Sequence, residues 1–304
     1  MNRINYFHSL IFFNICILLS AFDFLRNNDF LILSLFLILS LGISHGALDH
    51  LKGMKLLKIL KYETIYMFYF FYILLALIII FAWIILPKFL LLLFLIVASY
   101  HFGREDTNFL HQGNSNLDQL VYLIKGSLIV FSPLFFHFEE TLKIFETLFL
   151  SQTFLIFIKD EHWIINICLF LSILGYFYFI YKNKFKDFEI LLLDLMSILI
   201  LNYIFTPLIA FTIYFCFLHS IRHIISISYE LDPNNFLDGV KTFIKKALPL
   251  TFVTILLYLV AIVFLSNTYG LNDVIIKVIF IGLASLTFPH ILLEYLLEKN
   301  EKRT

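Results

Sequence analysis

Apolar residues run through the chain in stretches of about twenty, and short polar segments between them carry most of the charges. A stretch of this length, coiled as an α-helix, crosses the hydrocarbon core of a bilayer. The pattern predicts ten transmembrane helices, at residues 8–25, 30–48, 64–86, 88–104, 117–137, 162–181, 189–205, 207–227, 247–266 and 273–296. Hydrophobic residues make up 61% of the 304 positions, which leaves no soluble domain. We therefore expect an all-α integral membrane protein, with residues 1–304 forming one polytopic domain in a single helical bundle.

Three local features refine this topology. Residues 138–161 carry charges ahead of an apolar stretch that is too short to cross a bilayer, so we expect an interfacial or re-entrant piece. Pro87 and Pro207 each stand between two predicted spans, where proline suits a tight turn. The first apolar run has no small-residue cleavage site, so we expect it to remain as the first helix.

Basic residues are distributed unevenly between the two sides of the membrane. Ten spans put both termini and every second loop on one side, and that side holds fifteen of the Lys and Arg residues: Arg3, Lys52, Lys55, Lys58, Lys61, Arg104, Lys182, Lys184, Lys186, Lys241, Lys245, Lys246, Lys299, Lys302 and Arg303. The other side holds five: Arg26, Lys88, Lys143, Lys159 and Lys277. Because cytoplasmic loops carry the excess of Lys and Arg, we expect a multi-pass protein of the cell membrane with both termini in the cytoplasm.

Histidines interrupt the apolar pattern in one half of the predicted membrane region. Six of the ten histidines lie at or near the ends of spans that run toward the side of the termini: His45, His50, His101, His219, His223 and His290. At a rise of 1.5 Å per residue, their depths below that boundary range from roughly zero to 12 Å. Helices that pack side by side would bring these side chains to one point.

The sequence GISHGALDH at the end of the second run places two histidines and a carboxylate in apolar surroundings. Such groups are costly in hydrocarbon unless they are paired or bind something. In an α-helix, Asp49 lies one turn beyond His45 on the same face, whereas His50 points elsewhere. Gly42 and Gly46 have the spacing that lets another helix or a ligand approach the backbone closely.

His219 and His223 carry the clearest geometric signal. Their i, i+4 spacing puts two imidazoles on one helix face, with Cβ atoms about 6 Å apart, and this arrangement can chelate a metal ion. The three cysteines show no CxxC spacing and carboxylates are few, which disfavours a structural zinc site and a hard-ion cage. Neutral imidazoles suit iron, copper or zinc, so the ligand type leaves the metal open. We expect Arg222, on a neighbouring face, to pair with Asp49, Asp106 or a lipid phosphate.

A third polar stretch, YHFGREDTNF, closes the fourth span. Gly103 would let the chain bend there or let another backbone come close. Glu105 and Asp106 are consistent with interfacial charges, and Asp106 is also a candidate acceptor that orients a ligand imidazole and fixes its tautomer. His290, in the last span, is equally consistent with a structural and a functional role.

The motifs SHGALDH at 44–50, YHFGREDTNF at 100–109 and HSIRH at 219–223 occur in this order in a multispan chain. Together they resemble the Brp/Blh family of bacterial and archaeal membrane β-carotene 15,15′-dioxygenases, over roughly residues 40–295. The resemblance implies that the protein cleaves β-carotene at its central double bond with Fe(II) and O2, giving two molecules of retinal. By the same resemblance the iron ligands are His45, His101, His219 and His223. Asp49, His50, Asp106 and His290 match family-like positions and are candidates for groups that orient the ligands.

The resemblance also implies the partners. The substrates would be β-carotene and O2, the surroundings membrane lipid, and a rhodopsin apoprotein would be the eventual acceptor of retinal. The formal net charge of zero, with no basic stripe outside the short loops, argues against a nucleic-acid partner.

Two other classes remain open from the residues alone. A membrane di-iron desaturase or hydroxylase acting on fatty acids or carotenoids also uses histidine boxes, but the HxxHH doublets expected of that class are absent. A metal or proton transporter would line a path with polar groups in both halves of the membrane, whereas here they gather in one. The number of metal ions per protein separates the three: one iron for the dioxygenase, two for the desaturase, and a loosely held ion or none for the transporter.

Overall fold

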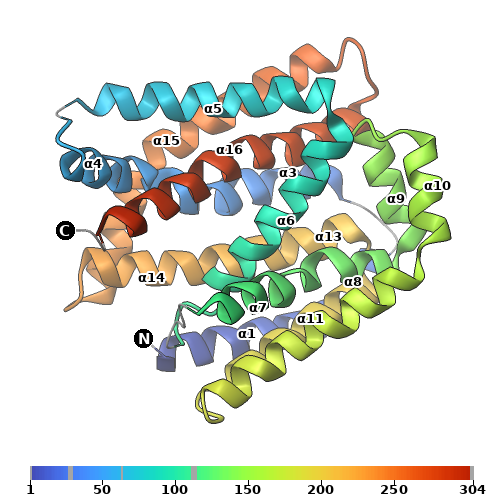
Figure 1. The fold of residues 1–304 in the computed structure, drawn as a ribbon, viewed down its shortest axis with the longest axis horizontal. Coiled ribbons are helices and arrows are strands. Elements are labelled where there is room, and N and C mark those ends of the chain that lie inside the picture. The colour runs from blue at the N-terminus through green and yellow to red at the C-terminus, as the bar shows by residue number, and fades with distance from the viewer. Residues whose placement is uncertain (1, 27–29, 63, 111–114, 302–304) are drawn as a thin grey trace.

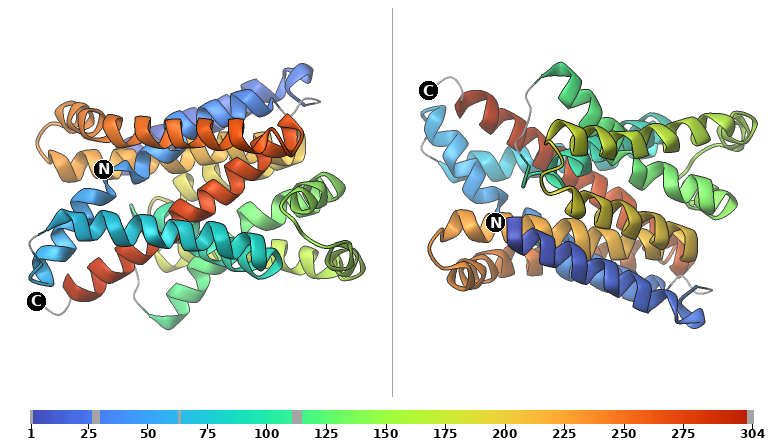
Figure 2. Two further views of the ribbon diagram at one scale, coloured as in Figure 1. Left: turned by 90° about the horizontal axis from the view of Figure 1, so that it is seen from above. Right: turned by 90° about the horizontal axis from the view of Figure 1, so that it is seen from below.

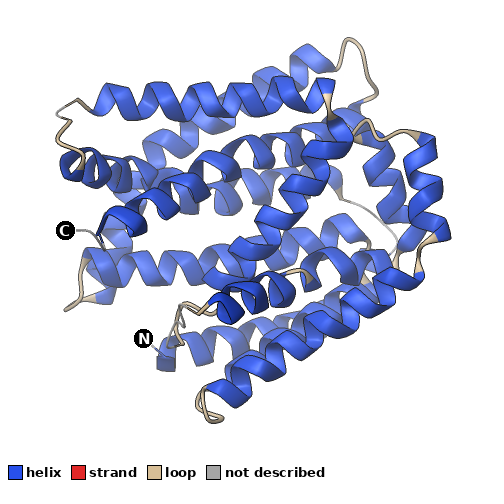
Figure 3. Ribbon diagram, viewed as in Figure 1, coloured by secondary structure: helices blue, strands red, loops and turns tan. Residues whose placement is uncertain are grey.

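The computed structural model describes residues 2–26, 30–62, 64–110 and 115–301, and every regular element in these ranges is a helix (Figure 3). The α-helices are α1 (Asn2–Ser20), α2 (Asp23–Arg26), α3 (Leu31–Leu37), α4 (Asp49–Ile59), α5 (Ile65–Ile85), α6 (Pro87–Glu105), α7 (Asn116–Gly126), α8 (Leu128–Phe136), α9 (Phe138–Thr147), α10 (Gln152–Asp160), α11 (Trp163–Lys182), α12 (Phe188–Ile204), α13 (Pro207–Ile213), α14 (Ile221–Leu231), α15 (Phe236–Leu265) and α16 (Leu271–Glu301). Between them, η1 (Ile38–Gly42) and η3 (Tyr214–Ser220) are π-helical, and η2 (Ile43–Leu48) is a 3-10 helix.

The predicted all-α membrane architecture is confirmed. Within the described ranges, nine helical stretches are long and apolar enough to cross a bilayer. The predicted span that is not among these nine is the seventh, residues 189–205, which corresponds to α12, a slightly shorter helix of 17 residues. Several helices run past the predicted boundaries; the second passage continues through η1 and η2 to Ile59. Hydropathy marks the part of a helix that lies in hydrocarbon, whereas backbone hydrogen bonding carries the helix on into the polar region.

The segment 138–161 contains no helix long enough to cross a bilayer, as predicted, and whether it is interfacial or re-entrant stays a prediction. Residues 138–161 contain α9 and α10, which have ten and nine residues and are too short to cross a bilayer. Pro87 and Pro207 each begin a helix, α6 and α13. Proline is well placed there, because the first turn of a helix leaves its N–H groups without intrahelical partners.

The helices are arranged around one obliquely crossing member, α6 (Figure 1). On one flank lie α5, α15 and α16; on the other lie α1, α7, α8, α11 and α12, with α13 and α14 nearby. Both chain ends lie at the same end of the bundle, which we call the terminal end, and α9 and α10 lie at the opposite, distal end (Figures 1 and 2).

The flank formed by α1, α7, α8, α11 and α12, the packed side, is closely packed. Helix α12 contacts α1, α8 and α11, and α7 contacts α6 and α11. At the α6–α7 crossing, a Cβ added to Gly103 would lie 2.7 Å from the carbonyl carbon of Tyr122 and 3.0 Å from the backbone nitrogen of Gly126. The close approach predicted at Gly103 is confirmed, since any side chain there would push the two helices apart.

The opposite flank, the hollow side, is built differently. Helix α5 packs on α4, α6 and α16, and α15 packs on α14 and α16, but α5 and α15 make few contacts with each other. Viewed from above, they lie apart with α16 crossing between them (Figure 2, left). The space that they enclose with α6 and α16 is a cavity, described below.

Candidate metal centre

Two of the histidine motifs fall where a membrane-crossing helix leaves α geometry. The GISHGALDH motif begins at the end of η1 and runs through η2, and His219 lies in η3. Segments of π-helix are uncommon and are frequently found at functional sites. The two deformed passages pack against each other: a Cβ added to Gly42 would lie 2.5 Å from the Phe215 ring, and the Ser220 hydroxyl donates to the Gly42 carbonyl at 3.3 Å. The close approach predicted at Gly42 is confirmed.

Four imidazoles gather near the terminal end, from α6, η3, α14 and α16. The ring centre of His101 lies 5.2 Å from that of His219 and 5.2 Å from that of His290, and the His223 and His290 ring centres are 6.0 Å apart. All four side chains are buried. All four are among the six histidines predicted to converge, although only His101, His219 and His223 of these were predicted as iron ligands. The side chain of His45 lies outside the part of the structure that is described, so its role as a ligand stays a prediction.

Three of these imidazoles present Nδ1 to a carboxylate. The pairs are His219 with Asp106 Oδ1 at 2.9 Å, His223 with Glu105 Oε2 at 3.1 Å, and His290 with Asp49 Oδ1 at 2.9 Å. An ionised carboxylate only accepts hydrogen bonds, so Nδ1 carries the proton and the neutral ring has its lone pair on Nε2. Metal-binding histidines are typically oriented by such a carboxylate. The contact proposed for Asp106 from the sequence is therefore present, and Glu105, interpreted as a possible interfacial charge, makes the same kind of contact.

Asp106 is held in place by a buried polar network. The Tyr214 hydroxyl donates to its second carboxylate oxygen at 2.6 Å, and Arg222 donates to its backbone carbonyl at 3.0 Å. The Arg222 guanidinium also binds both carboxylate oxygens of Asp194, at 2.5 and 3.0 Å. The expected side-chain partner of Arg222 is thus corrected, because α12 places Asp194 opposite it. Pairing of this kind offsets the cost of burying the charges.

The surroundings of Asp49 differ from the pattern expected of a regular helix. Its described partners are His290 and Tyr72, whose hydroxyl donates to Asp49 Oδ2 at 2.8 Å. Because η2 is a 3-10 helix with three residues per turn, the i, i+4 register expected between His45 and Asp49 does not apply. His50 donates from Nδ1 to the Ala47 carbonyl at 3.0 Å, which ties its ring to its own turn of helix.

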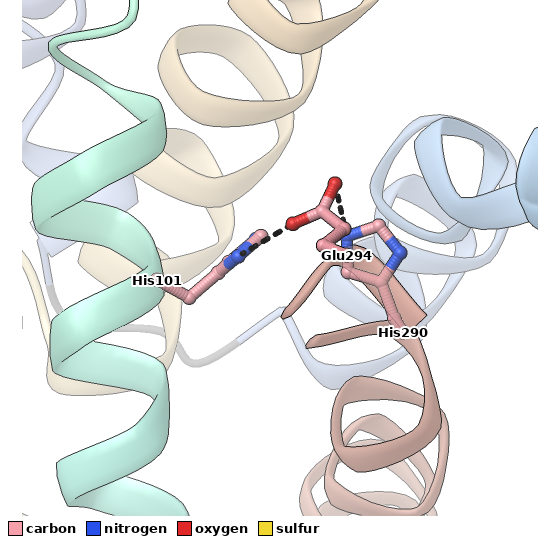
Figure 4. A group of neighbouring side chains, drawn as sticks. All are labelled: His101, His290 and Glu294. Atoms are coloured by element: carbon pink, nitrogen blue, oxygen red, sulfur yellow. Dashed lines mark ion pairs between the residues drawn. The ribbon is translucent and has the colours of Figure 1, made fainter. Parts of the chain in front are cut away.

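Glu294 belongs to the cluster and was not singled out from the sequence. Figure 4 shows its carboxylate between the His101 and His290 rings, with one oxygen 3.8 Å from His101 Nδ1 and the other 3.6 Å from His290 Nε2. One potential ligand atom from each of these three residues lies within 4.8 Å of the others. Lys52 donates to Glu294 at 2.6 Å. The signal that could have found Glu294 is its i, i+4 spacing from His290, the same spacing that links His219 to His223.

Within the described residues, His101, His290 and Glu294 have ligand atoms close enough together for one metal ion, and the spacing of neighbouring imidazoles is compatible, pair by pair, with a shared ion. With metal–nitrogen bonds of about 2.1 Å, two imidazoles bound to one ion place their ring centres roughly 4.5 to 6.5 Å apart. The separations of 5.2, 5.2 and 6.0 Å fall within this range. Imidazoles whose Nδ1–H groups are held by carboxylates are suitable ligands for iron, copper or zinc.

A cavity of about 950 Å³ extends from this cluster toward the distal end. His101, His290 and Asp49 line its terminal end, and Lys277 lines the other. Lys277 precedes His290 by thirteen residues on α16, which corresponds to about 20 Å along the helix. The walls between are mainly apolar side chains of α5, α6, α15 and α16. A long, apolar cavity with a few polar groups at one end suits an extended hydrophobic ligand.

The cavity opens between α5 and α15. Ile73 and Leu77 on α5, and Val253 and Leu257 on α15, line the cavity and are also exposed on the outside of the bundle, Leu257 by 63%. In a bilayer this outer surface faces lipid tails. A molecule dissolved in the hydrocarbon therefore has access to the cavity without passing through water.

Fold and site together define an integral membrane protein in which a buried histidine cluster faces a cavity open to hydrocarbon. Comparison with known proteins identifies the class further. The profile described as beta-carotene 15,15′-dioxygenase matches residues 36–298, and the chain belongs to this family of dioxygenases. A protein named beta-carotene 15,15′-dioxygenase, from uncultured marine bacterium 66A03, is 28% identical over 266 residues, covering 86% of this chain and 92% of the relative. No solved structure gives a significant match.

Proposed function

We propose that the protein cleaves β-carotene at its central 15,15′ double bond with O2 and Fe(II), producing two molecules of retinal. The observation that carries the proposal is the carboxylate-oriented histidine cluster at the end of an apolar cavity that opens toward lipid. The family and the name of the relative support the substrate.

The ligands that we propose for iron are His45, His101, His219 and His223, with His290 beside them. Iron bound there would supply the activation of O2. Asp106 and Glu105 would keep the His219 and His223 rings turned toward the ion by holding their Nδ1 protons.

The remaining task of the chain is to hold the polyene. Apolar walls would exclude water and keep the substrate extended past the histidines. The overall reaction adds one oxygen atom to each carbon of the cleaved bond and gives two aldehydes. Both atoms of O2 enter the products and no proton is gained or lost, so no acid, base or nucleophile from the protein is required.

The rival classes find less support in this geometry. The imidazoles of His101, His219, His223 and His290 form one cluster, whereas a di-iron desaturase must bind two ions. A transporter needs polar groups along a path through the membrane, but the walls beyond the histidines are mainly apolar up to Lys277. The metal content of the purified protein separates the three, because only the dioxygenase requires one iron.

Expression in cells that accumulate β-carotene tests the reaction. The orange colour should fade and extracts should contain retinal as the sole cleavage aldehyde, because cleavage at the centre of a symmetric molecule gives one product. The His162→Ala variant, changed at an exposed position between α10 and α11, should behave like the wild type. Intact carotene together with new double bonds or hydroxyl groups in the fatty acids would instead favour the di-iron class.

The orientation and the acceptor of the product are also part of the proposal. We place the protein in the cell membrane with the histidine end toward the cytoplasm, on the basis of fifteen basic residues against five. A rhodopsin apoprotein would be the eventual acceptor of retinal. Reporter fusions after Thr304 should be active in the cytoplasm, and a signal from the outside would show the orientation to be inverted.

A further inference from the structure

Three side chains that the proposed chemistry does not use line the distal end of the cavity: Phe149, Tyr269 and Lys277. Lys277 lies over two aromatic rings, with Nζ 3.9 Å from the centre of Phe149 and 4.9 Å from the centre of Tyr269. Its ammonium also donates to the Thr147 carbonyl. Lys277 is only 6% exposed, and all three side chains line the cavity. A cation held by two aromatic faces and a carbonyl is a fixed wall and not a mobile surface lysine.

The distance from Lys277 to the histidines sets how much of an extended substrate the cavity can hold. About 20 Å separate the Cα positions of Lys277 and His290 along α16, and a space of this length holds about one half of an extended carotene but not the whole molecule. A carotene whose central bond lies at the histidines therefore places one half inside the cavity. The other half has an exit through the opening between α5 and α15, past Ile73 and Leu257.

We propose that Phe149, Tyr269 and Lys277 form a stop for one ring of the substrate, and that the distance from this stop to the histidines selects which double bond is cleaved. The inference rests on the proposed function. These are specificity-determining residues, because they meet the far end of the substrate and not the reacting atoms. Whichever bond is selected, O2 delivers one oxygen to each of its carbons. Central cleavage gives one aldehyde, and cleavage of any other bond gives two aldehydes of different length.

Lengthening the cavity tests the stop. Phe149 has a positive φ of 73°, so Phe149→Gly removes the ring at a position where glycine is unstrained. Lys277→Ala removes the cation and leaves space. Either variant should let the substrate slide deeper, so that a pair of unequal apocarotenals replaces a substantial share of the retinal. Lys277→Met, which keeps the length of the side chain, should restore retinal as the main product.

The ratio of products is measured on whatever activity a variant retains, so a loss of rate does not mask the result. Retinal alone from both Phe149→Gly and Lys277→Ala would overturn the stop. The absence of any cleavage aldehyde from the wild-type protein would instead overturn the proposed function, and the two failures are therefore distinct.

A second measurement needs no turnover. Metal-free protein carrying Phe149→Cys should react with a maleimide several-fold more slowly after β-carotene is added, because the bound ring covers the thiol. Val260→Cys provides the matched control, since Val260 is exposed on α15 and does not line the cavity. Equal labelling of Phe149→Cys with and without carotene would show that no ring reaches the distal end.

Discussion

The two flanks of the bundle meet at the histidines but differ in how closely their helices pack. On the packed side, Arg222 and Asp194 pair in the interior, and glycines bring α6 and α7 into backbone contact. On the hollow side, α5 and α15 stand apart and their apolar side chains face both the cavity and the lipid. The difference suggests a division of labour: one flank fixes the ligands, and the other leaves room for a substrate.

Two of the three carboxylate–histidine pairs show this difference at the level of single contacts. Asp106 and His219 are 2.9 Å apart, and Asp106 is also bound by Tyr214 and by Arg222, so the pair is enclosed by protein. The pair of Asp49 and His290 has the same length, but both residues line the cavity. The Asp106–His219 pair is therefore buried in the interior, whereas the Asp49–His290 pair lies at the edge of the cavity.

Removal of an imidazole that does not line the cavity should have the largest effect. His219→Ala and His223→Ala should each lose the bound iron and all detectable cleavage, because each removes a proposed ligand whose ring is oriented by its own carboxylate. Metal analysis of purified protein and retinal assays measure both. The His162→Ala protein serves as the control, and full iron occupancy in the His219→Ala variant would contradict the ligand assignment.

Exchange of a carboxylate for an amide should affect stability differently on the two flanks. Asp106→Asn and Asp49→Asn should each weaken metal binding or activity by about 10- to 100-fold, the usual effect of losing a group that orients a ligand. Asp106→Asn should in addition destabilise the fold by about 1–3 kcal/mol, because it weakens the buried hydrogen bonds that Tyr214 and His219 make to this carboxylate. Thermal unfolding in detergent measures this difference. Equal unfolding temperatures for the two variants would refute the contrast between the flanks.

A bulky side chain at the opening should have the smallest effect, and that effect should be limited to substrate access through the hollow side. Leu257→Trp narrows the gap between α5 and α15, so kcat/KM for β-carotene should fall several-fold while iron content and stability stay unchanged. Val260→Trp adds the same ring to the same helix, on a surface that does not line the cavity. If both variants lose activity equally, the opening between α5 and α15 is not the path of access.

Periodicity and composition were sufficient for the membrane fold because the bilayer imposes simple rules. Long apolar runs must be helices, since backbone groups in hydrocarbon have to be satisfied within the helix itself. The same reasoning placed six histidines in one half of the predicted membrane region and identified the close approaches at Gly42 and Gly103. Local spacing also predicted that His219 and His223 come from one helical passage.

The sequence alone predicted the helical membrane fold and the histidines that form most of the cluster. Only the tertiary structure decided which of these groups meet, because partners such as Asp194 and Arg222, or Asp49 and His290, are brought together by helix packing and not by spacing along the chain. It also decided the local register, since the π and 3-10 segments at residues 38–48 rotate the motif away from the face that a regular helix would give it. The cavity has the same origin: a gap between α5 and α15 depends on where helices do not pack, and no local pattern in either helix encodes that.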